Sequence, residues 1–175
     1  MLELIKEKLA HLDGMILSSA VNEELEEFMK KLDPPALDII EIGTHNGLSS
    51  ALMSAYARRV FTFDISLRNS EYVWNLLNVR SKIRAFVGSP EQIWYELNYQ
   101  KYEYKLKKVT LDFNFAFIDD WHEYYSVKKS FEMVKFCGRV LFHDYGLCSG
   151  VYDFCNEIGA KPISDSKIFA YWEGQ

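Results

Sequence analysis

Apolar residues recur at helical spacing in two segments near the start of the chain, residues 2–12 and residues 25–32. Asn22 can cap the second segment, since a side-chain oxygen there accepts a hydrogen bond from the first helical turn. The sequence DPP at 33–35 ends that segment, because the residue before a proline disfavours helical backbone. Residues 1–35 are therefore expected to form helices that act as a lid or cover the sheet.

From residue 36 onward, short apolar runs alternate with segments of helical periodicity. The expected strands are 36–42, 60–65, 83–87, 114–118 and 139–142. The expected helices are 48–58, 70–80, 91–104, 124–136 and 150–158. The closing segment 161–173 has the pattern of a strand, a turn and a final strand. This alternation predicts an α/β domain over residues 36–175, a three-layer αβα Rossmann-like sandwich around a mostly parallel sheet.

Composition narrows the class of protein. The chain has 175 residues, a net charge of −5 and 49% hydrophobic residues, which is typical of a globular domain. Lysine and arginine are scattered, so the basic patch expected of nucleic-acid binding is missing. No apolar run approaches the roughly 20 residues that span a bilayer, and no signal-peptide core is visible. We therefore expect a cytoplasmic protein that binds neither nucleic acid nor membrane.

The first expected strand runs into the sequence EIGTHNG, residues 41–47. Gly43 and Gly47 have no Cβ atom, so the backbone can approach a ligand closely beside the N–H groups of the next helix. Glu41 adds a negative charge, which would repel a pyrophosphate and attract a cationic ligand. The spacing is GxxxG, whereas dinucleotide sites carry GxGxxG. The pattern favours a cofactor pocket; the alternative is a helix-capping turn with a solvated acid.

Two further residues follow expected strands at the same edge of the sheet. Asp64 comes about 20 residues after the glycine turn, where an acid can accept hydrogen bonds from a ribose diol. Ser89, in the sequence GSP, could lie at the edge of an adenine ring. An N-cap of the following helix explains Ser89 equally well.

The later strands end in groups of polar and aromatic residues. IDDWHEYY follows one strand at 118–125, and FHDYG ends the next at 142–146. Because parallel strands end at one edge, Asp119, His122 and Asp144 are expected to converge there with His143. Such a group could bind a divalent ion or act as acid and base, and His122 is the candidate base. The alternative for His143 and Asp144 is a structural hydrogen-bonded pair.

These motifs resemble those of the class I S-adenosylmethionine-dependent methyltransferases, over residues 36–172. The last of them, FAFIDDWHEYYSVKKSFEMVKFCGRVLFHDYG, looks like the small-molecule O-methyltransferase branch, whose pattern runs I-D-x-x-H-x-Y-x-x-V and later ends a strand in H-D. The resemblance implies a seven-stranded sheet whose final strand, near 168–172, is antiparallel. It also implies S-adenosylmethionine as cofactor, bound by Glu41, Gly43, Thr44, Asn46, Gly47, Asp64, Ile65, Ser89 and Asp119.

Within that family the acid before the glycine turn serves the amino-acid end of the cofactor, and the acid after the second strand takes the ribose hydroxyls. Glu41 and Asp64 match these positions. His45 and Asn46 stand where many relatives have a glycine.

Some members of the branch hold Mg²⁺ with acidic residues at the positions of Asp119, His143 and Asp144. His143 departs from that pattern, because the metal-binding members carry a carboxylate there and Mg²⁺ prefers oxygen. The resemblance therefore implies either a different metal or a protein that works without one.

The expected reaction is methyl transfer to a hydroxyl group of a small molecule. His122 would remove the proton, and Asp119 would orient His122 or help to hold a metal. The aromatic residues expected to wall the acceptor site are Trp121, Tyr124, Tyr125 and Tyr145. The expected partner is a small-molecule acceptor, and a homodimer is compatible with the sequence.

The sequence leaves three alternative functions. A non-catalytic protein that binds S-adenosylmethionine or a nucleotide would suit the altered motifs. An NAD-type dinucleotide-binding protein or oxidoreductase lacks support, because GxGxxG is missing. A purely structural domain leaves the clustering of acids and histidines at strand ends unexplained.

Overall fold

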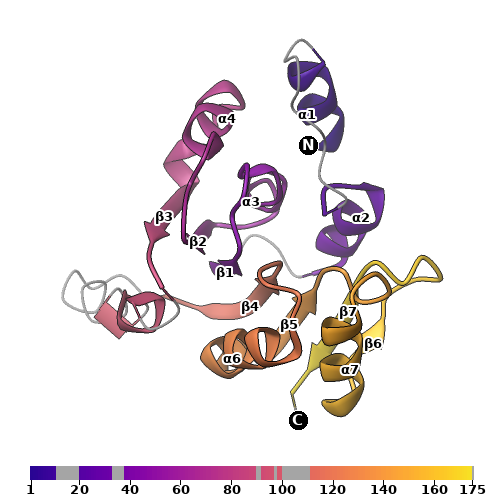
Figure 1. The fold of residues 1–175 in the computed structure, drawn as a ribbon. Helices are drawn as coiled ribbons and strands as arrows, with labels where there is room; N and C mark the ends of the chain where they lie inside the picture. The colour runs from indigo at the N-terminus through magenta and orange to yellow at the C-terminus, as the bar shows by residue number, and fades with distance from the viewer. Residues whose placement is uncertain (11–19, 33–37, 90–91, 97, 100–110, 175) are drawn as a thin grey trace.

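The computed structural model describes residues 1–10, 20–32, 38–89, 92–96, 98–99 and 111–174 (Figure 1). Its centre is one sheet of seven strands in the order β3-β2-β1-β4-β5-β7-β6. The strands are β1 (Asp38–Ile42), β2 (Arg59–Asp64), β3 (Ile83–Val87), β4 (Phe113–Ile118), β5 (Arg139–Phe142), β6 (Lys161–Pro162) and β7 (Ala170–Glu173). β1 to β5 pair in parallel, while β7 pairs antiparallel with both β5 and β6. The expected fold class is confirmed, including the antiparallel final strand.

Helices cover both faces of the sheet (Figure 1). They are α1 (Leu2–Leu9), α2 (Glu23–Lys31), α3 (Leu48–Ser54), α4 (Ser70–Leu76), α6 (Tyr124–Val134) and α7 (Ser149–Glu157), with short 3₁₀ helices η1 (Arg80–Lys82) and η2 (Lys135–Cys137). Residues 92–96 and 98–99 are also helical, and the rest of the helix expected at 91–104 lies outside the described residues. No described helix combines the length and the apolar character that crossing a bilayer requires.

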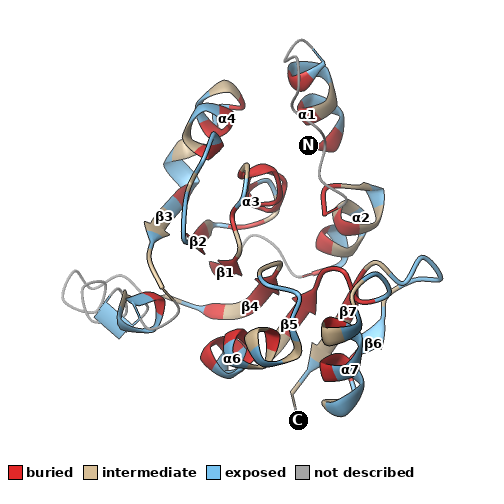
Figure 2. Cartoon of the chain, viewed as in Figure 1, coloured by how far each residue is buried: buried red, intermediate tan, exposed pale blue. Residues whose placement is uncertain are grey.

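Alternate residues of the strands feed two hydrophobic cores. Ile39 packs on one face with residues from α1, α2, α3 and α4, whereas Ile40 packs on the other with residues from α6 and α7. Both faces are buried, which explains why the strands are continuous apolar runs (Figure 2). The two N-terminal helices share the first core with the sheet, as a cover would; a lid role stays a prediction.

Two helices end four residues earlier than their periodicity predicted, at 54 instead of 58 and at 76 instead of 80. α3 stops at Ser54, because the N–H groups of Ala55 and Tyr56 bond three residues back and tighten the last turn. α4 stops at Leu76, and Asn78 then adopts a left-handed backbone conformation, with φ of 55°, that a helix cannot continue through.

An ion cluster fixes the start of β1. The Asp38 side chain is fully buried, and both of its oxygens accept hydrogen bonds from the guanidinium groups of Arg58 and Arg59. The backbone N–H of Asp112 donates to the same carboxylate at 2.8 Å. This cluster links the first residue of β1 to the starts of β2 and β4, and so helps to set the register of the strands that carry the site.

The end of β5 is fastened to the C-terminal hairpin. Beyond the β5–β7 ladder, the N–H of Tyr145 donates to the carbonyl of Ile168 at 3.0 Å, and that of Gly146 donates to the carbonyl of Lys167 at 2.6 Å. The turn that follows β5 is thereby held in place by residues far along the chain.

Candidate active site

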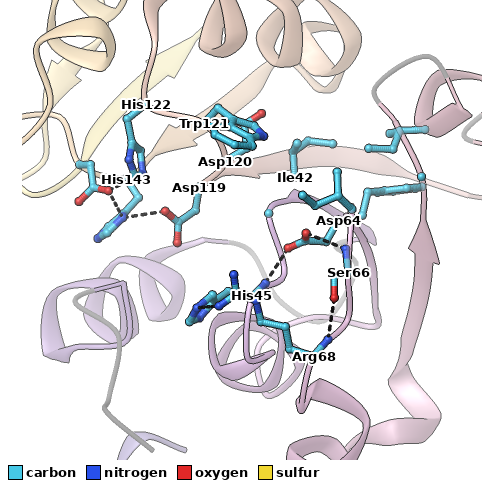
Figure 3. Close-up of a pocket in the computed structure, with 16 residues that line it drawn as sticks. Ile42, His45, Asp64, Ser66, Arg68, Asp119, Asp120, Trp121, His122 and His143 are labelled. Carbon is cyan, nitrogen blue, oxygen red and sulfur yellow. Dashed lines mark hydrogen bonds and ion pairs between the residues drawn. The ribbon is translucent and has the colours of Figure 1, made fainter.

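A cavity of about 560 Å³ opens at the carboxyl ends of the parallel strands (Figure 3). One side is formed by residues at the ends of β1 and β2 and in the turns after β1, β2 and β3, including Gly43, Asp64 and Ile65. The other side is formed by residues 119–122 after β4 and 143–144 after β5. This position at the edge of a doubly covered parallel sheet is where such folds bind ligands.

At its two glycines, the turn after β1 packs too closely against its neighbours to leave room for a side chain. Gly43 has φ of +95°, and a Cβ atom there would lie 2.0 Å from the backbone oxygen of Asp119. Gly47 has φ of +74°, and its Cβ would lie 2.5 Å from Nε1 of Trp74, which donates a hydrogen bond to the Gly47 carbonyl. The two glycines therefore allow the turn to lie against its neighbours, with Gly43 bordering the cavity.

Asp64 links β2 to the glycine turn. Its Oδ2 accepts hydrogen bonds from the backbone N–H groups of Thr44, at 2.7 Å, and His45, at 2.8 Å. Its Oδ1 accepts from the N–H of Ser66 at 3.1 Å (Figure 3). The carboxylate borders the cavity, and since each of its oxygens can accept about two hydrogen bonds, one acceptor position on Oδ1 is left for a ligand.

Glu41 is fully buried beneath the glycine turn and does not border the cavity. Its oxygens accept hydrogen bonds from the hydroxyl groups of Ser49, at 2.5 Å, and Ser50. Burial raises the pKa of Glu41 to about 7, against the opposing effect of these hydroxyl groups. The solvated acid of the alternative interpretation is therefore wrong, while a cofactor contact stays a prediction.

The other expected cofactor residues take different places. Ile65 is exposed and borders the cavity. Thr44 is buried, and its hydroxyl lies 2.5 Å from that of Thr62. Asn46 does not border the cavity, and neither does Ser89, whose N–H donates to Oε1 of Gln92 while its hydroxyl accepts from the Gln92 N–H. Ser89 therefore has the contacts of an N-cap residue, the interpretation that the sequence left open.

The four polar residues expected to converge do so, as one hydrogen-bonded chain. Nδ1 of His143 lies 2.8 Å from Oδ1 of Asp119 and 3.2 Å from Oδ2 of Asp144. The same Oδ2 lies 2.8 Å from Nε2 of His122. The expectation that Asp119 orients His122 is wrong, because Asp144 is the carboxylate in contact with it. Asp144 reaches both histidines from a left-handed turn, with φ of 60°.

Charges within this chain shift two pKa values. Burial alone would lower the pKa of His143, but the carboxylates of Asp119 and Asp144 raise it to about 9. Burial alone would raise the pKa of Asp144, but the His143 contact lowers it below its usual range. At neutral pH the group therefore contains an imidazolium ion between two carboxylates.

The donor set does not fit Mg²⁺. One nitrogen and two carboxylate oxygens, from His143, Asp119 and Asp144, lie within 4.8 Å of one another. Mg²⁺ requires oxygen ligands in near-octahedral geometry, whereas here the nitrogen stands between the two oxygens and is hydrogen-bonded to them. The side chains of Asp119, His143 and Asp144 therefore do not support the magnesium site that the resemblance implied.

The cavity is also bordered by residues that the sequence does not single out as site residues, among them Asp120, Arg68 and Ser66. Oδ1 of Asp120 is buried without a hydrogen-bond partner among the described residues, and burial raises the pKa of this carboxyl to about 7. The guanidinium group of Arg68, in the loop after β2, lies 2.7 Å from Nε2 of His45, in the turn after β1. Ser66 lies beside them (Figure 3). Asp120 was visible as the second acid of IDD, but nothing in the sequence indicated the pairing of Arg68.

Only one of the four expected aromatic residues borders the cavity. Trp121 lies at its edge with 65% of its surface exposed. Tyr124 instead bonds to Glu157 and packs on Phe154 between α6 and α7. Tyr145 is buried beside Tyr152, and the highly exposed Tyr125 stacks edge-on against Tyr124. The wall expected of these residues therefore reduces to Trp121.

Comparison with solved structures shows which fold this is. An O-methyltransferase from Bacillus cereus in complex with SAH has 16% identity and a TM-score of 0.66, over 98% of this chain and 90% of that one. TomG, an O-methyltransferase from Streptomyces achromogenes involved in tomaymycin synthesis and solved with SAM, has 15% identity and a TM-score of 0.67, over 99% and 89%. A precorrin-8w decarboxylase from Methanobacterium thermoautotrophicum has 10% identity and a TM-score of 0.59, over 87% and 90%.

No protein-family model matches the chain, and no curated protein matches its sequence. At these identities a structural likeness establishes the fold alone. The chain has the Rossmann-like fold of the class I S-adenosylmethionine-dependent O-methyltransferases.

Proposed function

We propose that the protein is an S-adenosylmethionine-dependent methyltransferase that acts on a hydroxyl group of a small molecule. The observation that carries this proposal is the arrangement of one cavity. Asp64 and the glycine turn border one side of it, and the His122–Asp144 pair borders the other. A cofactor held by the first side would present its methyl group toward the second.

The cofactor would supply an activated methyl group, and the protein would supply position and a base. Asp64 has one acceptor position left for a ribose hydroxyl, and Gly43 borders the cavity without a side chain that would extend into it or against Asp119. Ile65, exposed at the rim of the cavity, would contact the adenine ring. Binding both reactants in one cavity converts the reaction into an effectively intramolecular one.

His122 would remove the acceptor proton. Its Nε2 lies 2.8 Å from Asp144, so this nitrogen would donate a hydrogen bond to the carboxylate and leave the lone pair of Nδ1 free to act as base. As the oxygen–carbon bond forms and the sulfur–carbon bond breaks, the hydroxyl proton would pass to Nδ1. Asp144 would stabilise the resulting imidazolium.

The size of the cavity favours a small acceptor. Its volume of about 560 Å³ lies within the range of small-molecule sites. Trp121 at the rim offers an exposed ring on which a planar acceptor could stack. A cytoplasmic location and a homodimer remain predictions from the sequence.

The test is calorimetric titration of S-adenosylhomocysteine (SAH), with NAD titrated in parallel. We expect micromolar affinity for SAH, which corresponds to about −8 kcal/mol, and no binding of NAD. Asp64→Ala should abolish the SAH signal, while Asp153→Ala, an exposed residue on α7, should leave it unchanged. Binding of NAD alone, by folded protein, would contradict the proposal.

Binding alone does not establish transfer. The second step is a screen of hydroxylated small molecules with S-adenosylmethionine, read as SAH formation. A protein that binds SAH but methylates no acceptor in the screen would fit the non-catalytic alternative, and His122→Ala would then change nothing except stability.

A further inference from the structure

The His143 ring occupies the space between the two carboxylates that end β4 and β5. Its side chain is 4% exposed, its Nδ1 lies within 3.2 Å of both Asp119 and Asp144, and its ring packs against Phe169 at 5.2 Å between centroids. The packing against Phe169 and the contacts with the two carboxylates both restrict the ring, and Figure 3 shows the contact with Asp119.

Two carboxylates brought this close repel each other unless a positive charge or a hydrogen-bond donor lies between them. A divalent cation bound by both oxygens would have to take the place of the Nδ1–H of His143. The contacts at 2.8 Å and 3.2 Å show that this place is already filled by a donor from the protein itself.

We propose that His143 acts in place of a divalent cation, so that this site orders its carboxylates without a metal. The inference deepens the proposed function, on which its catalytic consequence rests. His143 contacts the carboxylate of Asp119 and Oδ2 of Asp144. The same Oδ2 contacts His122. His143 is thus a positioning residue, and His122 is the group that faces the acceptor.

The first experiment needs neither cofactor nor acceptor. The wild-type protein is dialysed against a chelator, and Mg²⁺, Mn²⁺, Ca²⁺ and Zn²⁺ are each titrated by calorimetry and by thermal unfolding. We expect no saturable binding at this site and a change in Tm below about 1 °C at millimolar concentration. Stoichiometric binding of any of these ions that is lost in Asp119→Asn would overturn the proposal. Zn²⁺ binding that Asp119→Asn retains but Asp144→Asn loses would use the neighbouring group of His122, Asp144 and Cys148, and it would also overturn the proposal, because a metal would then order Asp144.

The second experiment rebuilds a cation site. His143→Asp removes the internal donor and provides a third set of oxygen ligands. We expect Ca²⁺ or Mg²⁺ to raise the Tm of this variant by about 5 °C, as ligand binding to the folded state does. The double variant with Asp119→Asn should lose the increase. If the His143→Asp protein folds and neither Ca²⁺ nor Mg²⁺ changes its Tm, the His143 ring does not occupy the position of a cation and the proposal is wrong.

The two proposals fail separately. If SAH does not bind, the proposed function fails while the metal titrations still report on His143. If SAH binds and a metal also binds through Asp119, the function stands and the metal-free inference is wrong. A His143→Asp variant that does not fold leaves the wild-type titrations to decide.

Discussion

Gly43 lies against the backbone carbonyl of Asp119, so closely that a Cβ atom would stand 2.0 Å from that oxygen. The N–H of Asp119 also donates to the carbonyl of Ile42 at 2.8 Å. The turn after β1, expected to hold the cofactor, and the loop after β4, which leads to the base, are therefore in direct contact. Their separation is fixed by backbone rather than by side chains.

A methyl group at residue 43 should separate the two loops. We expect Gly43→Ala to lower the free energy of unfolding by at least about 2 kcal/mol and to weaken SAH binding, because the new Cβ must displace backbone. The control is Gly159→Ala, which also has positive φ but has no atom within 4 Å of the new Cβ. That variant should cost only about 1 kcal/mol, measured by urea unfolding. Equal losses in the two variants would show that the Asp119 contact has no effect.

The Asp38 cluster should be a main source of stability. Asp38→Asn removes the charge that compensates Arg58 and Arg59, and we expect a loss of about 3 kcal/mol in urea unfolding. Asp153→Asn, on the exposed side of α7, serves as control and should change stability by less than about 0.5 kcal/mol. Similar stabilities for both variants would mean that the buried ion cluster contributes little.

Glu41 should make the protein less stable as pH rises. Its folded-state pKa of about 7 lies above the ordinary value of 4.5, so folding favours the neutral form. The stabilisation is complete below pH 4.5 and is lost as pH rises through 7, by up to about 3 kcal/mol.

Glu41→Gln keeps a neutral side chain at every pH. We expect the decrease in unfolding free energy between pH 5 and pH 8 to be smaller in this variant than in the wild type. Glu132→Gln, an exposed change on α6, should keep the wild-type pH profile. A Glu41→Gln profile parallel to that of the wild type would show that Glu41 is ionised at neutral pH.

His122 and Asp144 should differ in how they affect turnover. Once an acceptor is known, His122→Ala should lower kcat by a factor of about 10² to 10⁴, while SAH affinity stays unchanged. Asp144→Asn should lower kcat and shift its pH dependence, because the carboxylate that contacts Nε2 is lost. Full turnover by His122→Ala would rule out His122 as the base.

The sequence predicted the sheet and the approximate place of the site for a physical reason. Apolar runs separated by helical segments leave few alternatives to a parallel sheet, and parallel strands collect their following residues at one edge. Asp64, Asp119 and His122 were found in this way, and all three border the cavity.

The pairing of side chains could not be predicted from the same pattern. Whether His122 contacts Asp119 or Asp144 depends on the left-handed turn at Asp144 and on the position of the His143 ring between the loops. Spacing along the chain also did not show that Glu41 faces α3, where Ser49 and Ser50 donate hydrogen bonds to it. A residue in a strand that is covered on both faces can point toward either layer.

The attachment of Tyr145 and Gly146 to residues 167–168 affects the order in which the protein can mature. On the ribosome, β1 to β4 emerge first and can begin to pair, but the turn after β5 gains its partners only when the last hairpin has been made. Until then β5 is an edge strand, and the turn that follows it, with His143 and Asp144, lacks its contacts with the last hairpin. The catalytic machinery is therefore expected to be the last part of the nascent chain to acquire its shape.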